Sequence, residues 1–154
     1  MAGIVRTFLF KLVLENAIEM EEKAYNFYEN AISKVEDPEP KQILRDLASQ
    51  ELKHRLKLEE VQREVSLGRF QVTENESAET IDTIAADWPE IGSEATSQEI
   101  LEIALSKEQY AYSFYTILRD KSTIKTVKEI FDALALEEKK HVDWVSAEIG
   151  KEEG

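Results

Sequence analysis

The stretch Glu51-Leu-Lys-His54 decides the fold, because its glutamate–histidine spacing returns once in the chain, as Glu138-Lys-Lys-His141. These two histidines are the only ones in the chain. Residues three apart lie on neighbouring turns of one helix face, so each pair can present a carboxylate oxygen and an imidazole nitrogen to one ion. Each pair therefore predicts a helix that carries half of a metal site.

The chain is an internal duplication. A shift of 87 positions superimposes the two pairs, and it also superimposes Glu21-Glu-Lys-Ala-Tyr-Asn-Phe-Tyr28 on Glu108-Gln-Tyr-Ala-Tyr-Ser-Phe-Tyr115. Under this shift 16 of the 45 residues from Leu14 to Leu58 are identical to their counterparts, far more than unrelated segments would share. Each half contributes two glutamates and one histidine.

Length and composition narrow the class of protein. A chain of 154 residues fits one domain, here 1–154, and the absence of cysteine excludes thiolate zinc sites, iron–sulfur centres and disulfides. The net charge of −13 argues against nucleic acid and anionic membranes as partners. The apolar stretch from Met1 to Leu14 is interrupted by Lys11 and is interpreted as helix, not as a signal peptide. We expect a cytoplasmic protein without membrane spans.

Apolar residues at the three-and-four spacing predict an all-α fold, a four-helix bundle of two antiparallel hairpins. The first hairpin is expected at 7–67, with helices from Thr7 to Val35 and from Pro38 to Leu67, and with Asp37 as N-cap. Residues 68–95 form a long crossover with a short helix near 78–87. The second hairpin is expected at 96–150: a capping box at 96–99 opens a helix to Leu118, and a turn at 119–122 leads into the last helix.

The spacing within each half predicts where the acidic residues meet. In an antiparallel hairpin, residues equidistant from the turn lie at the same height, and Glu21 and Glu51 are each about 15 residues, or roughly 22 Å, from their turn. Glu108 and Glu138 have the same relation to the second turn. If the hairpins pack as pseudo-twofold copies, six side chains converge at one level of the core: Glu21, Glu51, His54, Glu108, Glu138 and His141.

Four buried carboxylates need compensation, because an unpaired buried charge costs several kcal/mol or is neutralised by a proton. No lysine or arginine is predicted beside them, since Lys53 and Lys140 point about a third of a turn away. Two divalent cations would cancel the four charges. An oxygen-rich site with two nitrogens favours two iron ions, with manganese or a mixed iron–manganese pair also suitable.

Three alternatives stay open at the level of single residues. Glu137, four residues before His141, competes with Glu138, although its counterpart Gln50 favours Glu138. The hydroxyls of Tyr28 and Tyr115 can support a ligand carboxylate, or their rings can simply fill the core. The alternative interpretation of the whole pattern is an ordinary helical bundle that has two glutamate–histidine pairs on its surface and binds no metal.

The motifs resemble the rubrerythrin-type proteins of the ferritin-like di-iron carboxylate superfamily. The resemblance covers about residues 10–65 and 97–148, and it rests on Glu-x-x-Ala-x-x-Phe-Tyr in each odd helix and Glu-x-x-His in each even helix. It implies a four-helix bundle with a long crossover between helices two and three. It also implies that Glu51 and Glu138 bridge two irons, with the other four residues as terminal ligands.

Two features of the peroxidase-type rubrerythrins are missing. Those enzymes have an extra glutamate where this chain has Ala111, and a C-terminal rubredoxin domain with four cysteines. The resemblance therefore implies an oxidoreductase that reduces peroxide or oxygen with electrons from a separate carrier, such as a rubredoxin or ferredoxin, and that forms a homodimer. The alternatives are an iron-binding or ferroxidase module for storage or detoxification, and a metal-free interaction domain that presents Phe70 and Trp88.

Overall fold

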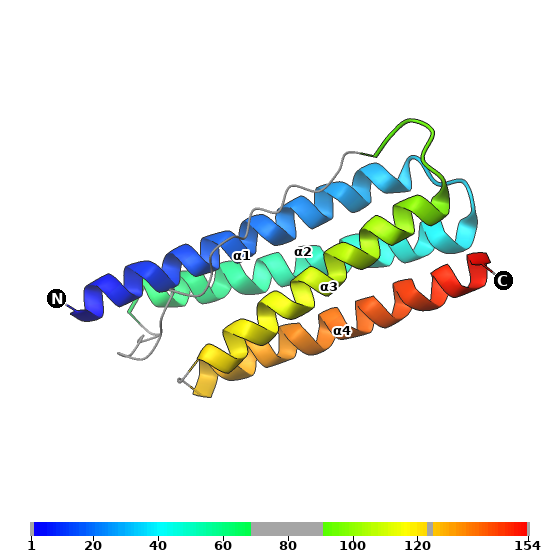
Figure 1. The fold of residues 1–154 in the computed structure, drawn as a ribbon. Helices are drawn as coiled ribbons and strands as arrows, with labels where there is room; N and C mark the ends of the chain where they lie inside the picture. The colour runs from blue at the N-terminus through cyan, green and yellow to red at the C-terminus, as the bar shows by residue number, and fades with distance from the viewer. Residues whose placement is uncertain (1, 69–90, 123–124, 154) are drawn as a thin grey trace.

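The computed structural model describes residues 2–68, 91–122 and 125–153, and these residues form four long helices (Figure 1). The described residues contain no strand. The helices are α1 (Ala2–Ile32), α2 (Pro38–Ser66), α3 (Ser97–Lys121) and α4 (Lys125–Glu153). The predicted all-α, four-helix fold is confirmed.

Helix α1 begins at Ala2, five residues before the predicted Thr7, because the apolar N-terminal stretch continues the helix, and it ends at Ile32. Asp37 is the N-cap of α2 with extended backbone and Pro38 follows in the first turn, as predicted, but the Asp37 side chain makes no capping hydrogen bond. Helix α2 ends at Ser66 with Leu67 as its C-cap, and Gly68 follows with a φ of 72°, in the left-handed region that glycine adopts without strain.

The capping box that opens α3 is present. The Thr96 hydroxyl accepts a hydrogen bond from the Glu99 N–H at 3.1 Å, and the Glu99 carboxylate accepts one from the Thr96 N–H at 3.4 Å. Helix α3 extends to Lys121, so the predicted turn at 119–122 is wrong at its start, and the helix cap is Ser122. The short helix predicted near 78–87 lies outside the described residues, as do Phe70 and Trp88.

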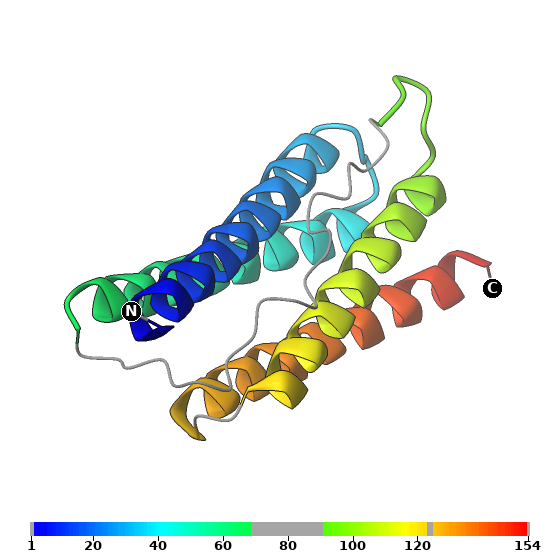
Figure 2. The same cartoon turned by 60° about the vertical axis from the view of Figure 1, so that its left-hand side comes forward.

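The helices pack as two antiparallel hairpins, α1 with α2 and α3 with α4, which meet along α1–α3 and α2–α4 (Figures 1 and 2). The connection between α1 and α2 lies at one end of the bundle and the end of α3 at the other (Figure 1). The two termini also lie at opposite ends. This is the arrangement expected of two copies of one hairpin related by a twofold axis across the bundle.

The core has two apolar layers with a polar layer between them. One layer gathers residues near the start of α1, the end of α2, the end of α3 and the start of α4, including Leu14, Leu58 and Phe131. The other gathers the opposite ends of the same helices, including Leu44, Leu47 and Leu101. Each fully buried leucine contributes about 1.5–3 kcal/mol. These two layers fix the helices on both sides of the polar layer.

Candidate metal centre

The polar layer contains all six residues that the sequence predicted to converge. Helix α1 supplies Glu21 and α3 supplies Glu108, while α2 and α4 each supply a glutamate and a histidine. None is more than 2 % exposed: Glu21, Glu51, His54, Glu108, Glu138 and His141. The convergence inferred from the hairpin spacing is therefore present in the structure.

The six side chains form two groups of four. In the first, Glu21 and His54 join Glu51 and Glu138; in the second, Glu108 and His141 join the same two glutamates. Within each group every residue offers one ligand atom, and these atoms all lie within 4.8 Å of one another. Because Glu51 and Glu138 belong to both groups, the geometry is compatible with two adjacent ion positions that share two carboxylates.

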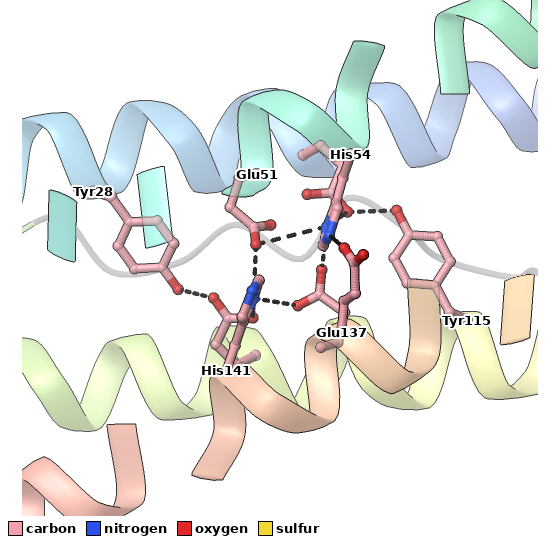
Figure 3. A network of polar contacts seen from close by, with 9 residues as sticks. Tyr28, Glu51, His54, Tyr115, Glu137 and His141 are labelled. Atoms are coloured by element: carbon pink, nitrogen blue, oxygen red, sulfur yellow. Dashed lines mark hydrogen bonds and ion pairs between the residues drawn. The ribbon is translucent and has the colours of Figure 1, made fainter. Parts of the chain in front are cut away.

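Each histidine turns its Nδ1 atom toward three carboxylates. His54 Nδ1 lies 2.8 Å from Glu138, 3.6 Å from Glu21 and 3.9 Å from Glu51. The two imidazole rings stack, with centroids 5.5 Å apart and planes 13° from parallel (Figure 3). One ring nitrogen can make only one hydrogen bond, so the crowding of oxygens around it exceeds what a proton can satisfy.

The second histidine has equivalent surroundings. His141 Nδ1 lies 3.2 Å from Glu51, 3.2 Å from Glu108 and 3.4 Å from Glu138. A cation placed among such atoms can attract the nitrogen lone pair and all three carboxylates at once. The chemistry of the donor set therefore fits a metal ion in each half.

Unsatisfied atoms point to the same fit. Among the described residues, several buried ligand atoms lie close to one another but make no well-aligned hydrogen bond, although buried polar atoms are normally paired. They are Glu21 Oε2, Glu51 Oε1, His54 Nδ1, and both carboxylate oxygens of Glu138. Orphaned atoms concentrated in one layer need a shared partner, and a cation is the partner that carboxylates and an imidazole have in common.

Two tyrosines close the polar layer on either side. The Tyr28 hydroxyl donates to Glu108 Oε1 at 2.5 Å, and the Tyr115 hydroxyl donates to Glu21 Oε1 at 2.5 Å (Figure 3). Each bond crosses between α1 and α3, so each tyrosine contacts the glutamate of the opposite repeat and not the one on its own helix. Burial and the neighbouring carboxylates raise the pKa of both phenols well above 10, so both remain protonated donors. The rings also pack in the core, so both readings of these tyrosines apply.

Protons are shared unequally within the layer. Burial, followed by the charges of nearby glutamates, raises the pKa of Glu51 and of Glu138 well above 4.5. Burial alone would also raise the pKa of Glu108, but its contacts with Glu138 and His141 outweigh burial and lower it. Without metal, protons therefore neutralise part of the excess negative charge, and metal ions would displace them.

The histidines gain protons in the same way. Burial alone lowers the pKa of His54, but contacts with Glu138 and Glu21 outweigh it and raise the pKa to about 12. Burial is likewise outweighed at His141, where contacts with Glu108 and Glu138 raise the pKa to about 10. An imidazole must be deprotonated at Nδ1 to bind metal there, so metal binding at this layer would release protons.

Glu137 has a role that the sequence analysis missed. From the sequence, Glu137 competes with Glu138 as the partner of His141. In the structure its Oε2 atom instead lies 2.5 Å from Nε2 of His54, across the α2–α4 interface (Figure 3). Its side chain is 46 % exposed. Both His54 and Glu137 line a groove of about 550 Å³ between α2 and α4. The only sign of this role in the sequence is that the counterpart of Glu137 in the first repeat is an uncharged residue, Gln50.

Lys107 is the second residue that the sequence analysis missed. It is only 6 % exposed, and its Nζ atom lies 4.9 Å from the centre of the Phe27 ring. Burial lowers its pKa to about 8, against the opposing charges of Glu108 and Glu51. Lys53 and Lys140 are exposed, as expected. A cation therefore does lie beside the cluster, one position before Glu108.

Helix periodicity and the comparison of the two halves predict that four further glutamates are solvated, and all four are at the surface. Glu15 and Glu102, which match each other in the duplication, are exposed, as are Glu19 and Glu22. The choice of ligand face, made from helix periodicity, thus separates the buried glutamates from the solvated ones.

A profile of the rubrerythrin family matches residues 13–88 and 99–154, which is most of the chain. The chain belongs to the rubrerythrin family. The solved structure of a hypothetical protein from Pyrococcus furiosus is similar to this rubrerythrin-family chain in fold: TM-score 0.69, 23 % sequence identity, 91 % of this chain and 87 % of that chain covered. A comparison with curated protein sequences gives no match.

The family and the buried cluster agree with each other. A rubrerythrin-family chain is expected to have a dinuclear metal site, and the two groups around Glu51 and Glu138 are compatible with one. Within the part of the chain that the structure describes, no helix has both the length and the apolar character needed to cross a membrane.

Proposed function

We propose that this protein binds two iron ions in the polar layer and reduces peroxide or oxygen with electrons delivered by a separate carrier. The observation that carries the proposal is the pair of four-residue groups that share Glu51 and Glu138. In this proposal Glu51 and Glu138 would be shared by both ions, Glu21 and His54 would hold one ion, and Glu108 and His141 would hold the other.

Charge supports two divalent ions. Four carboxylates and two neutral imidazoles carry a charge of −4 when fully deprotonated, which two divalent cations cancel. Oxygen ligands with one nitrogen per ion suit iron, and manganese or a mixed pair would use the same donors. The chain has no cysteine with which to hold an iron–sulfur centre of its own, so a rubredoxin or ferredoxin is the proposed electron donor.

The protein residues have three tasks in this proposal. Bound iron would supply the electrons and a Lewis acid for the two-electron reduction of peroxide to two waters, with two protons taken up. Tyr28 and Tyr115 hold the terminal carboxylates of Glu108 and Glu21 in place. The two apolar layers keep bulk water from the ions, and the small side chains of the buried Ala24 and Ala111, one turn from Glu21 and Glu108, leave room for a small oxidant.

We propose a homodimer, which is the assembly that the family resemblance implies. We propose the cytoplasm as its compartment, because the chain has no cysteine. Analytical ultracentrifugation of the metal-loaded protein tests the assembly. A dimer agrees with the redox enzyme, whereas a large shell would favour the storage alternative.

The experiment that tests the function is anaerobic loading with Fe²⁺ followed by mixing with peroxide in a stopped-flow spectrometer. We expect two Fe²⁺ per chain and oxidation of two Fe²⁺ per peroxide, repeatable after re-reduction. Glu138→Ala should abolish the rapid oxidation of bound Fe²⁺ by peroxide. Glu102→Ala, which changes an exposed glutamate on the same bundle, should keep that oxidation. Oxidation no faster than that of free Fe²⁺ would refute the proposal, and a single non-repeatable oxidation would favour storage.

A further inference from the structure

The duplication makes the two halves of the polar layer alike, so the positions where they differ in charge are informative. Several positions next to the six converging residues differ in charge between the halves, and two of them stand out by contact or burial: Glu137 contacts His54, and Lys107 is only 6 % exposed. Glu137 has Gln50 as its counterpart, and Lys107 has Met20. Relative to the first repeat, the second repeat therefore has an additional negative charge at Glu137 and an additional positive charge at Lys107.

The negative charge lies against His54. The Oε2 atom of Glu137 is 2.5 Å from Nε2 of His54, the ring nitrogen that faces away from the carboxylates, while Nδ1 faces them. With Nε2–H donating to Glu137, the imidazole is held in the tautomer whose Nδ1 lone pair points at the first group. A carboxylate as acceptor also makes the imidazole a stronger electron donor than a neutral acceptor would. Both effects strengthen cation binding in the first half.

The positive charge lies in the other half. Lys107 immediately precedes Glu108, the glutamate that belongs to the second group alone, and its side chain is almost fully buried against Phe27. A buried ammonium near Glu108 repels a cation in that half and is screened little by solvent. The two departures from symmetry therefore favour the same half.

We propose that the two ion positions are inequivalent: the first ion binds to the half formed by Glu21, His54, Glu51 and Glu138, and Glu137 is the positioning residue that gives this half its higher affinity. This inference rests on the proposed function, since it presupposes that the layer binds two ions. It adds an order of loading, and it assigns that order to a residue outside the six.

The order of loading has a direct test. Mn²⁺ is titrated into the metal-free wild-type protein by calorimetry, and crystals grown with one Mn²⁺ per chain are examined by anomalous scattering. We expect two binding steps of different affinity, with anomalous density in the His54 half. Density in the His141 half, or two steps of equal affinity, would overturn the inference.

The role of Glu137 is tested with Glu137→Gln, which keeps an oxygen that can accept from Nε2 but removes the charge, and which makes the position the same as Gln50 in the other half. Loss of such a partner typically weakens metal binding about 10–100-fold. We expect the tighter step to weaken at least about tenfold and the weaker step to stay within about threefold. The matched control is Glu129→Gln, an exposed carboxylate on α4 that lines the same groove.

The outcomes separate this inference from the function on which it rests. If wild-type protein binds no Mn²⁺ or Fe²⁺, the proposed function fails. If it binds two ions but Glu137→Gln matches both wild type and Glu129→Gln in its two affinities, only the inference fails. Glu137 is half exposed, so a thermal unfolding curve of the chelator-treated variant should match that of wild type and confirm that the variant is folded.

Discussion

Removal of the Tyr115 hydroxyl tests whether the tyrosines support the carboxylates or only fill the core. Tyr115→Phe keeps the ring, which stacks on Phe131 at 6.3 Å and meets Phe114 edge-on at 5.3 Å, so packing is preserved. The variant loses one buried hydrogen bond to Glu21 Oε1, and Glu21 Oε2 already has no hydrogen-bond partner. Hydrogen bonds to charged groups contribute about 1.5–3 kcal/mol, so we expect destabilisation in that range.

The assay is urea unfolding followed by circular dichroism, on protein as purified and after chelation. The matched control is Tyr112→Phe, one turn from Glu108 and half buried against the core, which should change stability by less than about 0.5 kcal/mol. For a chain of this size, 1 kcal/mol corresponds to roughly 2–4 °C in melting temperature, so Tyr115→Phe should also melt roughly 3–12 °C lower. If Tyr115→Phe were as stable as Tyr112→Phe, the hydroxyl would contribute nothing and the argument for carboxylate support would be refuted.

Three further predictions follow from the same geometry. Glu51→Ala should reduce the occupancy of both ions, whereas Glu21→Ala should reduce mainly one; equal losses by elemental analysis would contradict the sharing of Glu51. In metal-free protein, the melting temperature should fall as pH rises from about 6.5 to about 10. The pKa values of His54 and His141 in the folded state, raised to about 12 and 10, keep protons there that the unfolded state loses above about 6.5, so stability that is fully present below 6.5 decreases as pH rises. A flat profile would contradict the proton sharing. Leu47→Ala, in the apolar layer beside the cluster, should cost about 2–5 kcal/mol in urea unfolding, and a cost below 1 kcal/mol would show that the layer is loosely packed.

The position of the cluster was predictable because helix periodicity and the duplication act together. Periodicity places Glu21, Glu51 and their counterparts on buried stripes, and the equal distances to the turns place them at one height. Both arguments depend only on the rise and twist of a helix, which every sequence shares. The same periodicity correctly put Glu102 at the surface.

One error concerns the start of a helix, and two others arose where the answer depended on contacts between helices. The start of α1 at Ala2 has no capping signal in the sequence, so the predicted start at Thr7 was too late. Glu137 reaches His54 because α2 and α4 approach each other at that level, and spacing along α4 alone suggested His141 instead. Lys107 is buried against Phe27 from α1, a contact that no periodicity within α3 can show. Tertiary packing, not local pattern, decides such cases.

The dinuclear site is tested by the number of Fe²⁺ ions that bind per chain at saturation under anaerobic conditions, determined by elemental analysis after removal of unbound metal. We predict two per chain in wild type and fewer than one in the double variant Glu51→Ala, Glu138→Ala, because these two residues belong to both groups. A well-folded wild-type protein that binds no iron, or a double variant that still binds two ions, would contradict the claim that these six buried side chains form a dinuclear metal site.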